Sequence, residues 1–336
     1  MINMKISKIG ERKLIQRLLK KRDETLGNID NTILKSYHDD AAIEENTSKY
    51  TVLSTDMLIQ HSHFPKQMTY FQMGEKIVTV NVSDILAMNA TPISILIAMA
   101  LPSTLTLDEF DEIIDGILYK CKEYDVTLIG GDLNQSDEII LSATTTGKIN
   151  KNIKLQSNIQ EDNLVAITGQ LGMPAAALDL LSKYEIKDLS NEYEEIIKSI
   201  LEPNLPIKTA KFLREHPTLI TSMTDITDGL AIELGHLHEK NTNIGFEIYA
   251  DKLPYNKHIS QIATENNKSL NDYLLHFGEE FELLLTLDKK EYLKYKDKLN
   301  NIHIIGKVNN SDKITLISQK SVKTMKITGY EHLKEN

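Results

Sequence analysis

Aspartates beside small or hydroxyl residues recur through the first two thirds of the chain. They occur in the segments His38-Asp39-Asp40-Ala41-Ala42, Ser54-Thr55-Asp56, Val82-Ser83-Asp84, Gly130-Gly131-Asp132 and Asp225-Ile226-Thr227-Asp228-Gly229. Most lie where an apolar run meets a turn or a helix start, so we expect the carboxylates to project from the ends of elements. Gathered carboxylates repel one another strongly at low dielectric and need cations. Hard oxygen ligands favour Mg²⁺ or Ca²⁺, and a site with several Mg²⁺ ions usually holds phosphates, so the pattern predicts an enzyme that uses ATP.

Each of these residues also has a structural interpretation. Asp228 could be the N-cap of the helix that follows it, although Asp225 and Asp228 together also suit a metal or a phosphate bound at a helix N-terminus. The other candidates have equally plain alternatives: Asp84 as a helix cap, Asp40 and Asp132 as turn residues, His61 and His63 as a surface pair, and Glu279 and Glu280 as a polar turn tip. If the last pair, Glu279 and Glu280, were buried without partners, the buried carboxylates would destabilise the folded chain.

Two common nucleotide-binding motifs are absent from the sequence. There is no G-x-x-x-x-G-K-[ST] segment and no protein-kinase glycine loop with its lysine and aspartate motifs. Phosphoryl transfer, if it occurs, must therefore use another scaffold.

Composition narrows the function classes further. The 336-residue chain has a formal net charge of −10, which argues against nucleic-acid binding. It has four arginines, so phosphate binding must depend on metal ions and backbone amides. Cys121 is the single cysteine, which leaves no intramolecular disulfide. No apolar run is long enough to span a bilayer and the start lacks a signal-peptide core, so we expect a soluble cytoplasmic protein.

Strands and helices alternate along the whole chain, which predicts an α/β or α+β layer structure in each half. Helices are expected at residues 9–23, after the capping box Thr106-Leu107-Asp108-Glu109, and at 228–239. Strands are expected at 51–59, 93–101, 138–149, 164–168, 245–250 and 281–287, with a short strand leading to Gly130. Residues 74–88 could form either a strand or a buried helix. Polarity rises near residue 150, and we place a domain boundary there, giving domains 1–149 and 150–336.

Taken in order, these motifs resemble the thiamine-monophosphate kinase family. The resemblance is carried by Gly10-Glu11, D-D-A-A-I, S-T-D-M-L with His63-Phe64 following, N-V-S-D-I-L-A-M, G-G-D, D-I-T-D-G-L and G-E-E-F-E-L. The match runs over nearly the whole chain. The family belongs to the superfamily of aminoimidazole-ribonucleotide synthetase, hydrogenase-maturation factor E and selenophosphate synthetase.

The resemblance implies a two-domain fold in which N-terminal sheets of two subunits form a barrel-like homodimer core. ATP would bind in a groove between the domains, with its phosphates bridged by several Mg²⁺ ions. The γ-phosphoryl group of ATP would pass in line to thiamine monophosphate, giving thiamine diphosphate, and the N-terminal domain would serve both ATP/Mg²⁺ binding and dimerisation.

The resemblance also implies roles for individual residues. The metal ligands would be Asp40, Ser54, Thr55, Asp56, Asp84, Asp132, Asp225 and Asp228, of which Asp84, Asp132 and Asp228 would be catalytic. ATP would be contacted by Gly131, Asp132, Thr227 and the position of Gln156, and the thiamine side by His63, Glu279 and the position of Ile327.

Several positions depart from the family pattern, among them a mild change from aspartate to glutamate at Glu280. His38 replaces a glycine before the Asp-Asp pair, and Gln156 replaces an arginine that contacts an ATP phosphate. Phe277 replaces a glycine near the substrate pocket, and Ile327 aligns with an aromatic residue that stacks on the substrate. These departures spare the metal ligands and fall on ATP and substrate contacts.

Two alternatives remain open on the sequence. One is a synthetase of the same superfamily with another acceptor; Cys121, on the apolar face of a helix, is poorly placed for relatives that use a reactive cysteine. The other is an ATP-binding regulatory protein without catalysis, which would have little reason to hold so many carboxylates together.

Overall fold

The computed structural model describes residues 4–26, 33–34 and 43–330, and the chain divides into two compact units. One unit comprises Met1–Leu86 and Ala90–Lys151, and the other comprises Ala87–Asn89 and Asn152–Asn336. The elements of the first unit are α1 (Glu11–Leu26), β1 (Ile33–Leu34), β2 (Ile43–Glu44), β3 (Tyr50–Ile59), α2 (Gln60–His63), α3 (Tyr70–Ala87), β4 (Thr91–Leu101), α4 (Leu107–Glu123), β5 (Thr127–Gln135) and β6 (Ile140–Ile149). Those of the second are β7 (Leu164–Thr168), α5 (Met173–Lys183), α6 (Glu194–Leu201), α7 (Ile207–Glu215), β8 (Ile220–Asp225), α8 (Leu230–Glu239), β9 (Gly245–Tyr249), α9 (Ile259–Glu265), α10 (Leu270–His276), β10 (Leu283–Leu287), α11 (Lys289–Tyr295), β11 (Ile302–Asn309), β12 (Ile314–Ser318) and β13 (Ser321–Thr324).

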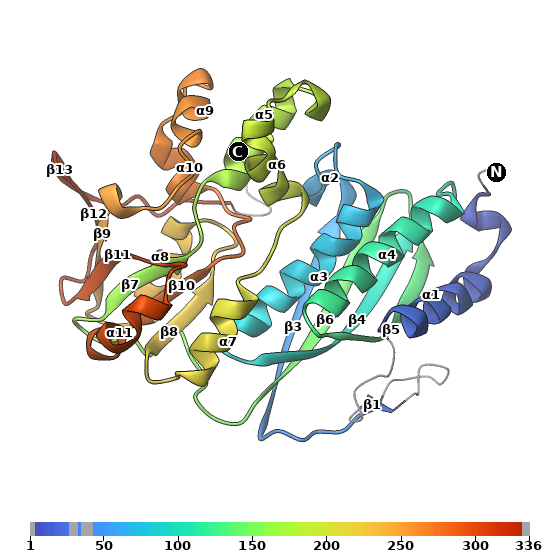
Figure 1. Ribbon diagram of the computed structural model, residues 1–336, viewed down its shortest axis with the longest axis horizontal. Coiled ribbons are helices and arrows are strands. Elements are labelled where there is room, and N and C mark those ends of the chain that lie inside the picture. The colour runs from blue at the N-terminus through green and yellow to red at the C-terminus, as the bar shows by residue number, and fades with distance from the viewer. Residues whose placement is uncertain (1–3, 27–32, 35–42, 331–336) are drawn as a thin grey trace. The chain divides into compact units, whose positions relative to one another are not determined.

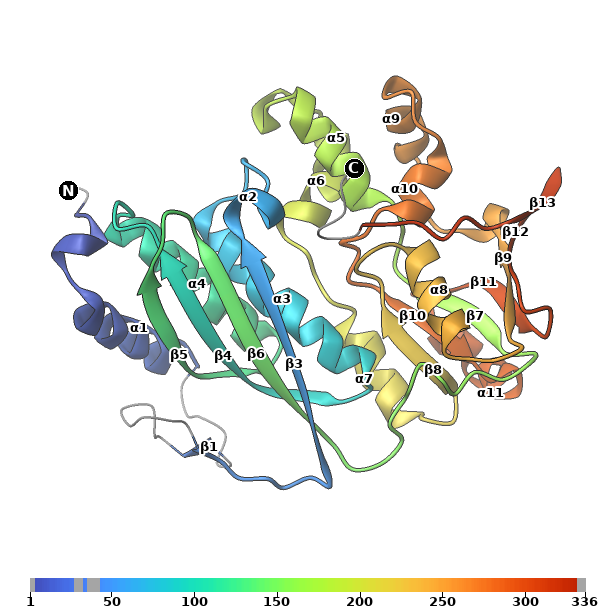
Figure 2. The same cartoon turned by 180° about the vertical axis from the view of Figure 1, so that it is seen from behind.

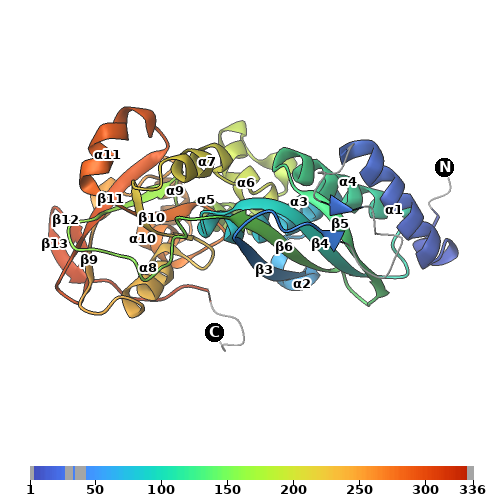
Figure 3. The ribbon, with the colours of Figure 1, turned by 90° about the horizontal axis from the view of Figure 1, so that it is seen from below.

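The first unit is built on a four-stranded sheet in the order β3-β6-β4-β5 (Figure 1). Strands β4 and β5 are parallel, while β6 is antiparallel to both β3 and β4. The helices α3 and α4 cover one face of the sheet, and α1 lies beside α4 on the same side (Figure 3). The edge strands of this sheet are therefore β3 and β5.

Helices α3 and α4 pack backbone against backbone. A Cβ atom on Gly74 would lie 2.1 Å from the carbonyl oxygen of Ile113, and one on Gly116 would lie 1.9 Å from that of Phe71. Only glycine allows this approach. This close packing positions α3, and therefore also the side chains that α3 directs toward the sheet.

The other face of the sheet is open in the described part of the chain. In Figure 2 its four strands lie in front of α3 and α4. Alternation along each strand places apolar side chains on this outer face: Leu53 is 67% exposed, Met57 53% and Leu96 38%. Thr55 lies on the same face between Leu53 and Met57, so this surface mixes apolar and hydroxyl side chains.

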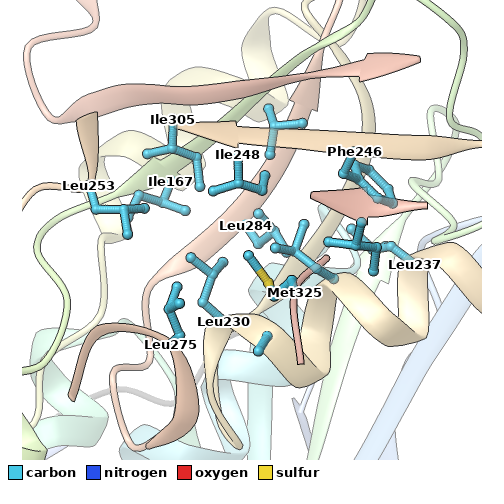
Figure 4. Close-up of a cluster of buried hydrophobic side chains, with 14 of the residues drawn as sticks. Ile167, Leu230, Leu237, Phe246, Ile248, Leu253, Leu275, Leu284, Ile305 and Met325 are labelled. Atoms are coloured by element: carbon cyan, nitrogen blue, oxygen red, sulfur yellow. The ribbon is translucent and has the colours of Figure 1, made fainter. Parts of the chain in front are cut away.

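The second unit is built on a seven-stranded mixed sheet in the order β13-β12-β9-β11-β7-β10-β8. Only β12 and β9 pair in parallel. Helix α8 buries its apolar face against the sheet, with Leu230 and Leu237 packing near Phe246 and Leu284 (Figure 4). The result is a mixed α/β architecture in each unit, as the alternation of elements predicts.

Most of the expected elements are present at or near the expected bounds. The capping box at Thr106 is formed in full, and α4 buries the predicted set Phe110, Ile113, Ile114, Ile117 and Cys121. The ambiguous segment 74–88 is a helix within α3. In the described part of the chain no helix combines the length and the apolar character needed to cross a bilayer.

Candidate active site

Asp56 and Asp84 meet between β3 and α3. Alternation along β3 turns Ser54 and Asp56 toward α3, where Ser54 donates a hydrogen bond from its Oγ to Oδ2 of Asp84. The backbone N–H of Asp56 donates to Oδ1 of Asn81 at 3.1 Å. Burial raises the pKa of Asp56 to about 7, and the negative charge of Asp84 and a hydrogen bond to it add to the increase. Two carboxyl groups held this close in a partly buried position form a site that a cation would stabilise.

The expectation that these aspartates project from element ends is wrong for this pair. Asp56 lies within β3 rather than at its end, and Asp84 lies within α3 rather than at a helix cap. The strand β3 continues to Ile59 and the helix α3 continues to Ala87, because both elements pack against each other beyond these aspartates. Asp56 thus projects from within the strand and Asp84 from within the helix, where β3 and α3 pack against each other.

Thr55 lies on the opposite side of β3 from Asp56. Its Oγ1 donates to the carbonyl of Ala143 at 2.8 Å and accepts from Oγ1 of Thr144 at 3.1 Å. The hydroxyl therefore faces the outer surface of the sheet, away from the pair Asp56–Asp84.

Asp132 lies on the edge strand β5, which continues past it to Gln135. The expectation of a turn at Asp132 is therefore wrong. Asn134 donates from Nδ2 to Oδ2 of Asp132 at 2.5 Å. Next to it, Gly131 adopts φ +157°, and a Cβ there would lie 1.8 Å from the carbonyl oxygen of Ile97, so only glycine fits. The register of β4 and β5 shifts just beside this glycine pair, so the edge is irregular here.

A cavity of about 410 Å³ lies along this part of β5. Gly131 and Asp132 line it together with Leu18 and the buried Arg22 of α1. Its walls are mostly apolar side chains from α1, α4, β4 and β5. Apolar walls with a few polar groups are typical of small-molecule sites.

His63 is the last residue of the short helix α2. Its Nδ1 accepts the backbone N–H of Ile59 at 3.0 Å, and its carbonyl accepts a hydrogen bond from the buried Nζ of Lys76 at 2.8 Å. The contact of Nδ1 fixes the position of the ring against β3. Asp40 and His38 lie outside the described residues.

Asp225, Thr227 and Asp228 lie on a loop of the second unit that runs from β8 to α8. Asp225 is buried at the end of β8. The prediction that Asp228 is the N-cap of the following helix is wrong: Gly229 occupies that position with φ +113°, and no side chain caps the helix. A Cβ on Gly229 would lie 2.4 Å from the carbonyl oxygen of Phe277, which explains the glycine.

This loop is held by the segment that precedes β10. The N–H of Glu279 donates to the carbonyl of Thr227 at 2.8 Å, and the N–H of Phe281 donates to that of Ile226 at 3.0 Å. Glu279 and Phe281 both have positive φ, at 66° and 50°. Two non-glycine residues in this region are a strained arrangement of the kind found at functional sites.

Glu280 and Glu282 contribute half-buried carboxyl groups. The sequence interpretation took Glu279 and Glu280 as a polar turn tip and did not anticipate these contacts. Oε1 of Glu280 accepts the N–H of Gly172 at 2.7 Å, and Thr168 donates its hydroxyl to Glu282. Burial raises the pKa of Glu280 well above its ordinary value and that of Glu282 to about 7. Both line a cavity of about 600 Å³ with Gln170 and residues of α5 and α6. The sequence signal was the run of carboxylates directly before an apolar strand.

Gln156 and Ile327, two of the departures, have defined neighbours. Nε2 of Gln156 donates to Oγ1 of Thr224 at 2.9 Å, and its Oε1 accepts a hydrogen bond from Nζ of Lys240. Lys240 thus brings a positive charge to the position where the family pattern has an arginine. Ile327 is 44% exposed and lies against Gly235 of α8, where a Cβ would be 2.7 Å from its Cγ2.

The donor set of the first unit suits a hard divalent cation, because Ser54, Asp56 and Asp84 offer oxygen ligands only. Among the described residues, however, no group of three or more His, Cys, Asp or Glu side chains forms a complete metal cluster. Further ligands have to come from outside the Asp56–Asp84 pair.

Comparisons with known proteins identify the family. Residues 37–149 match the model of the AIR synthase related protein N-terminal domain, and residues 160–319 match that of the C-terminal domain. Thiamine-monophosphate kinase of Pyrococcus horikoshii is 32% identical over 301 residues, covering 88% of this chain and 90% of the relative. The same enzyme of Methanocaldococcus jannaschii is 33% identical over 317 residues, covering 89% and 93%. The chain belongs to the thiamine-monophosphate kinase family.

Solved structures agree with this membership. Thiamine-monophosphate kinase of Stenotrophomonas maltophilia superposes with a TM-score of 0.78 at 26% identity, covering 90% of this chain and 95% of that one. AaThiL complexed with AMPPCP and TMP superposes with a TM-score of 0.76 at 25% identity, covering 99% and 100%. The hydrogenase-maturation protein HypE of E. coli, at 15% identity and a TM-score of 0.74, shares the fold. As a member of the thiamine-monophosphate kinase family the chain is a kinase, an enzyme of the phosphotransferase class.

Proposed function

We propose that this protein transfers the γ-phosphoryl group of ATP to thiamine monophosphate and releases thiamine diphosphate and ADP. The observation that carries the proposal is the partly buried carboxyl pair Asp56–Asp84 in a chain of this family. A regulatory protein would have no use for a carboxylate pair in which burial, and after it the charge of Asp84, raises the pKa of Asp56.

The transfer is an in-line displacement. A phosphate oxygen of thiamine monophosphate forms a bond to the γ-phosphorus, and the bond from that phosphorus to the β,γ-bridging oxygen breaks, with its electron pair leaving on ADP. The acceptor phosphate is ionised at neutral pH, so the residues of the site need to move no proton. Catalysis is then mostly positioning and electrostatic stabilisation.

Asp56 and Asp84 would hold Mg²⁺ with Ser54, and Asp40, Asp132, Asp225 and Asp228 would supply further ligands. The hydroxyl of Thr55 faces the outer surface of the sheet, so Thr55 would not share the ion of the Asp56–Asp84 pair through its side chain. When bound, Mg²⁺ neutralises the phosphates and stabilises the charge that develops on them. Gly131 and Thr227 would contact ATP, with Lys240 supplying positive charge beside Gln156. His63, Glu279 and Ile327 would contact the thiamine side. We assign ATP and Mg²⁺ binding and dimerisation to residues 1–149, and the remaining contacts to residues 150–336.

A synthetase that depends on a cysteine nucleophile is not favoured. Cys121 is fully buried in α4, and burial raises the pKa of its thiol to about 12. A thiol with that pKa is unreactive at neutral pH.

A direct product assay tests the proposal. Purified protein is incubated with ATP, Mg²⁺ and either thiamine monophosphate or unphosphorylated thiamine, and thiamine species and ADP are separated by chromatography. We expect thiamine diphosphate and ADP in equal amounts from thiamine monophosphate, and no phosphorylated product from thiamine. Release of ADP without thiamine diphosphate would contradict the proposed acceptor.

A further inference from the structure

The loop from β8 to α8 is held on its carbonyl side by two other segments of the second unit. The carbonyl of Thr227 accepts the N–H of Glu279 at 2.8 Å, and the carbonyl of Asp228 accepts the N–H of Tyr330 at 3.2 Å. The N–H groups at the start of a helix need acceptors as well, because the helix itself supplies none.

The first turn of α8 cannot be capped in the usual way. Gly229 occupies the N-cap position, and a Cβ there would lie 2.4 Å from the carbonyl oxygen of Phe277, so a capping side chain is excluded. Residues 230–232 that follow have apolar side chains. Glu233 is therefore the first residue of α8 whose side chain can accept a hydrogen bond.

Glu233 is buried and its side chain reaches back to this loop. Its carboxylate accepts a hydrogen bond from the backbone N–H of Asp228. The hydroxyl of Thr227 donates a long hydrogen bond to its Oε1 at 3.5 Å, and Nδ1 of His236 lies 3.2 Å from its Oε2. Both carboxyl oxygens thus have partners, which fixes the orientation of the side chain.

The position of Glu233 is unfavourable for a group that only ends a helix. A carboxylate taken out of water destabilises the folded chain unless its partners compensate, and this one also lies beside the negative charge of Asp228. Two carboxylates near one another are expected where the loop has to present one of them to a cation.

We propose that Glu233 is a positioning residue for the phosphate site. It holds the backbone of Asp228 and the hydroxyl of Thr227, so that this loop keeps the conformation in which it meets Mg²⁺ and ATP. The proposal rests on the proposed function in that it takes the loop to bind these two ligands. Glu233 acts through Thr227 and Asp228, since both of its oxygens are engaged within the protein.

Two conservative variants separate the reach of Glu233 from its charge. Glu233→Gln keeps the length and one acceptor oxygen but loses the charge, whereas Glu233→Asp keeps the charge and is one methylene shorter. We expect Glu233→Gln to bind AMPPCP with Mg²⁺ within about threefold of the wild type. Glu233→Asp should bind it at least roughly tenfold more weakly, with kcat lowered at least as much, because the loop is no longer held in place. Calorimetry and steady-state kinetics measure the two quantities. Equal impairment of both variants, the reverse order, or wild-type values in Glu233→Asp would overturn the positioning role.

Leu237→Ala controls for a simple loss of stability. Leu237 is buried in the same helix, in the apolar cluster that packs against the sheet (Figure 4), so its truncation leaves a cavity that lowers the unfolding temperature. At a temperature at which all variants are folded, AMPPCP binding and kcat of Leu237→Ala should equal those of the wild type. If both fall as far as in Glu233→Asp, the effect of Glu233 is one of stability and the proposal is overturned.

Nucleotide binding also separates this inference from the choice of acceptor. If Glu233→Gln binds AMPPCP well and Glu233→Asp binds it weakly while the wild type forms no thiamine diphosphate, the proposed acceptor is wrong and the role of Glu233 stands. If the wild type forms thiamine diphosphate and Glu233→Asp binds AMPPCP as the wild type does, the proposed function stands and the role of Glu233 is overturned.

Discussion

Asp56 on β3 and Asp84 on α3 hold their carboxyl groups against each other, and burial together with the charge of Asp84 raises the pKa of Asp56 to about 7. Ser54 completes the arrangement through its hydrogen bond to Asp84. Like charges placed this close destabilise the folded chain unless a cation or a proton compensates them. We therefore expect cation binding at this pair to stabilise the first unit.

In Asp84→Asn, the unfolding temperature should no longer depend on the Mg²⁺ concentration. Removing one charge relieves the repulsion, so we expect the unfolding temperature without Mg²⁺ to be no lower than that of the wild type. Mg²⁺ binds the folded state and should raise the unfolding temperature of the wild type only. Thermal unfolding of both proteins over a range of Mg²⁺ concentrations measures this, with the exposed Asp137→Asn as the control that behaves like the wild type. An equal Mg²⁺ response in Asp84→Asn would remove the pair from the metal site.

Lys240→Met should weaken ATP binding. The ammonium of Lys240 lies at Oε1 of Gln156, the position that has an arginine in the family pattern, and a charge-assisted contact to a phosphate would be lost. We expect the KM for ATP to rise roughly five- to tenfold, from the loss of about 1–1.5 kcal/mol, with the KM for thiamine monophosphate unchanged. The exposed Lys257→Met is the matched control. Unchanged steady-state kinetics in Lys240→Met would show that its charge does not reach ATP.

Gly278→Ala should destabilise the second unit. The added Cβ would lie 1.8 Å from the carbonyl oxygen of Thr227, so the loop of Asp225 and Asp228 has to shift. We expect a loss of about 3 kcal/mol or more in the free energy of unfolding, measured by urea denaturation. Gly10→Ala is the comparison: Gly10 has φ +82° but no atom within 4 Å of the added Cβ, so strain alone should cost about 1 kcal/mol. Similar losses in the two variants would argue against the close approach.

Glu282→Gln should remove a pH dependence of stability. Burial raises the pKa of Glu282 from 4.5 to about 7, so the folded state keeps a proton that the unfolded state releases between these values. The contribution of this group is therefore favourable below pH 4.5, is lost as the pH rises toward 7, and is constant above. We expect the stability of Glu282→Gln relative to the wild type to increase by roughly 2 kcal/mol between pH 5 and pH 8. The exposed Glu239→Gln should show no such change, and a flat difference for Glu282→Gln would contradict the assignment.

Local patterns in the sequence predict most of the elements. The capping box at Thr106 and the apolar spacing after it give α4 because both signals act within one helix turn. The segment 74–88 could not be assigned, because α3 is buried on nearly all sides and even its polar residues, such as Thr79 and Asn81, are buried, so no exposed polar face marks a helix. Its helical structure depends on tertiary packing, above all on the approach of Gly74 to Ile113.

The residue types of the site could be predicted, but their arrangement could not. The pattern of aspartates indicated metal ligands, yet the order of strands in the sheet depends on long-range pairing, and it is this order that separates Asp56 from Asp132. The hydrogen-bond partners of Glu280 and Glu282 likewise lie far along the chain, at Gly172 and Thr168.

Formation of thiamine diphosphate by the wild type and by Asp84→Asn, followed side by side as Mg²⁺ is titrated, tests the central claim most directly. We predict that the wild type forms thiamine diphosphate and ADP in equal amounts only when Mg²⁺ is present. A folded Asp84→Asn should be slower by at least roughly a hundredfold at every Mg²⁺ concentration. Thiamine diphosphate formed at the wild-type rate by Asp84→Asn, or by the wild type with all Mg²⁺ chelated, would contradict the account.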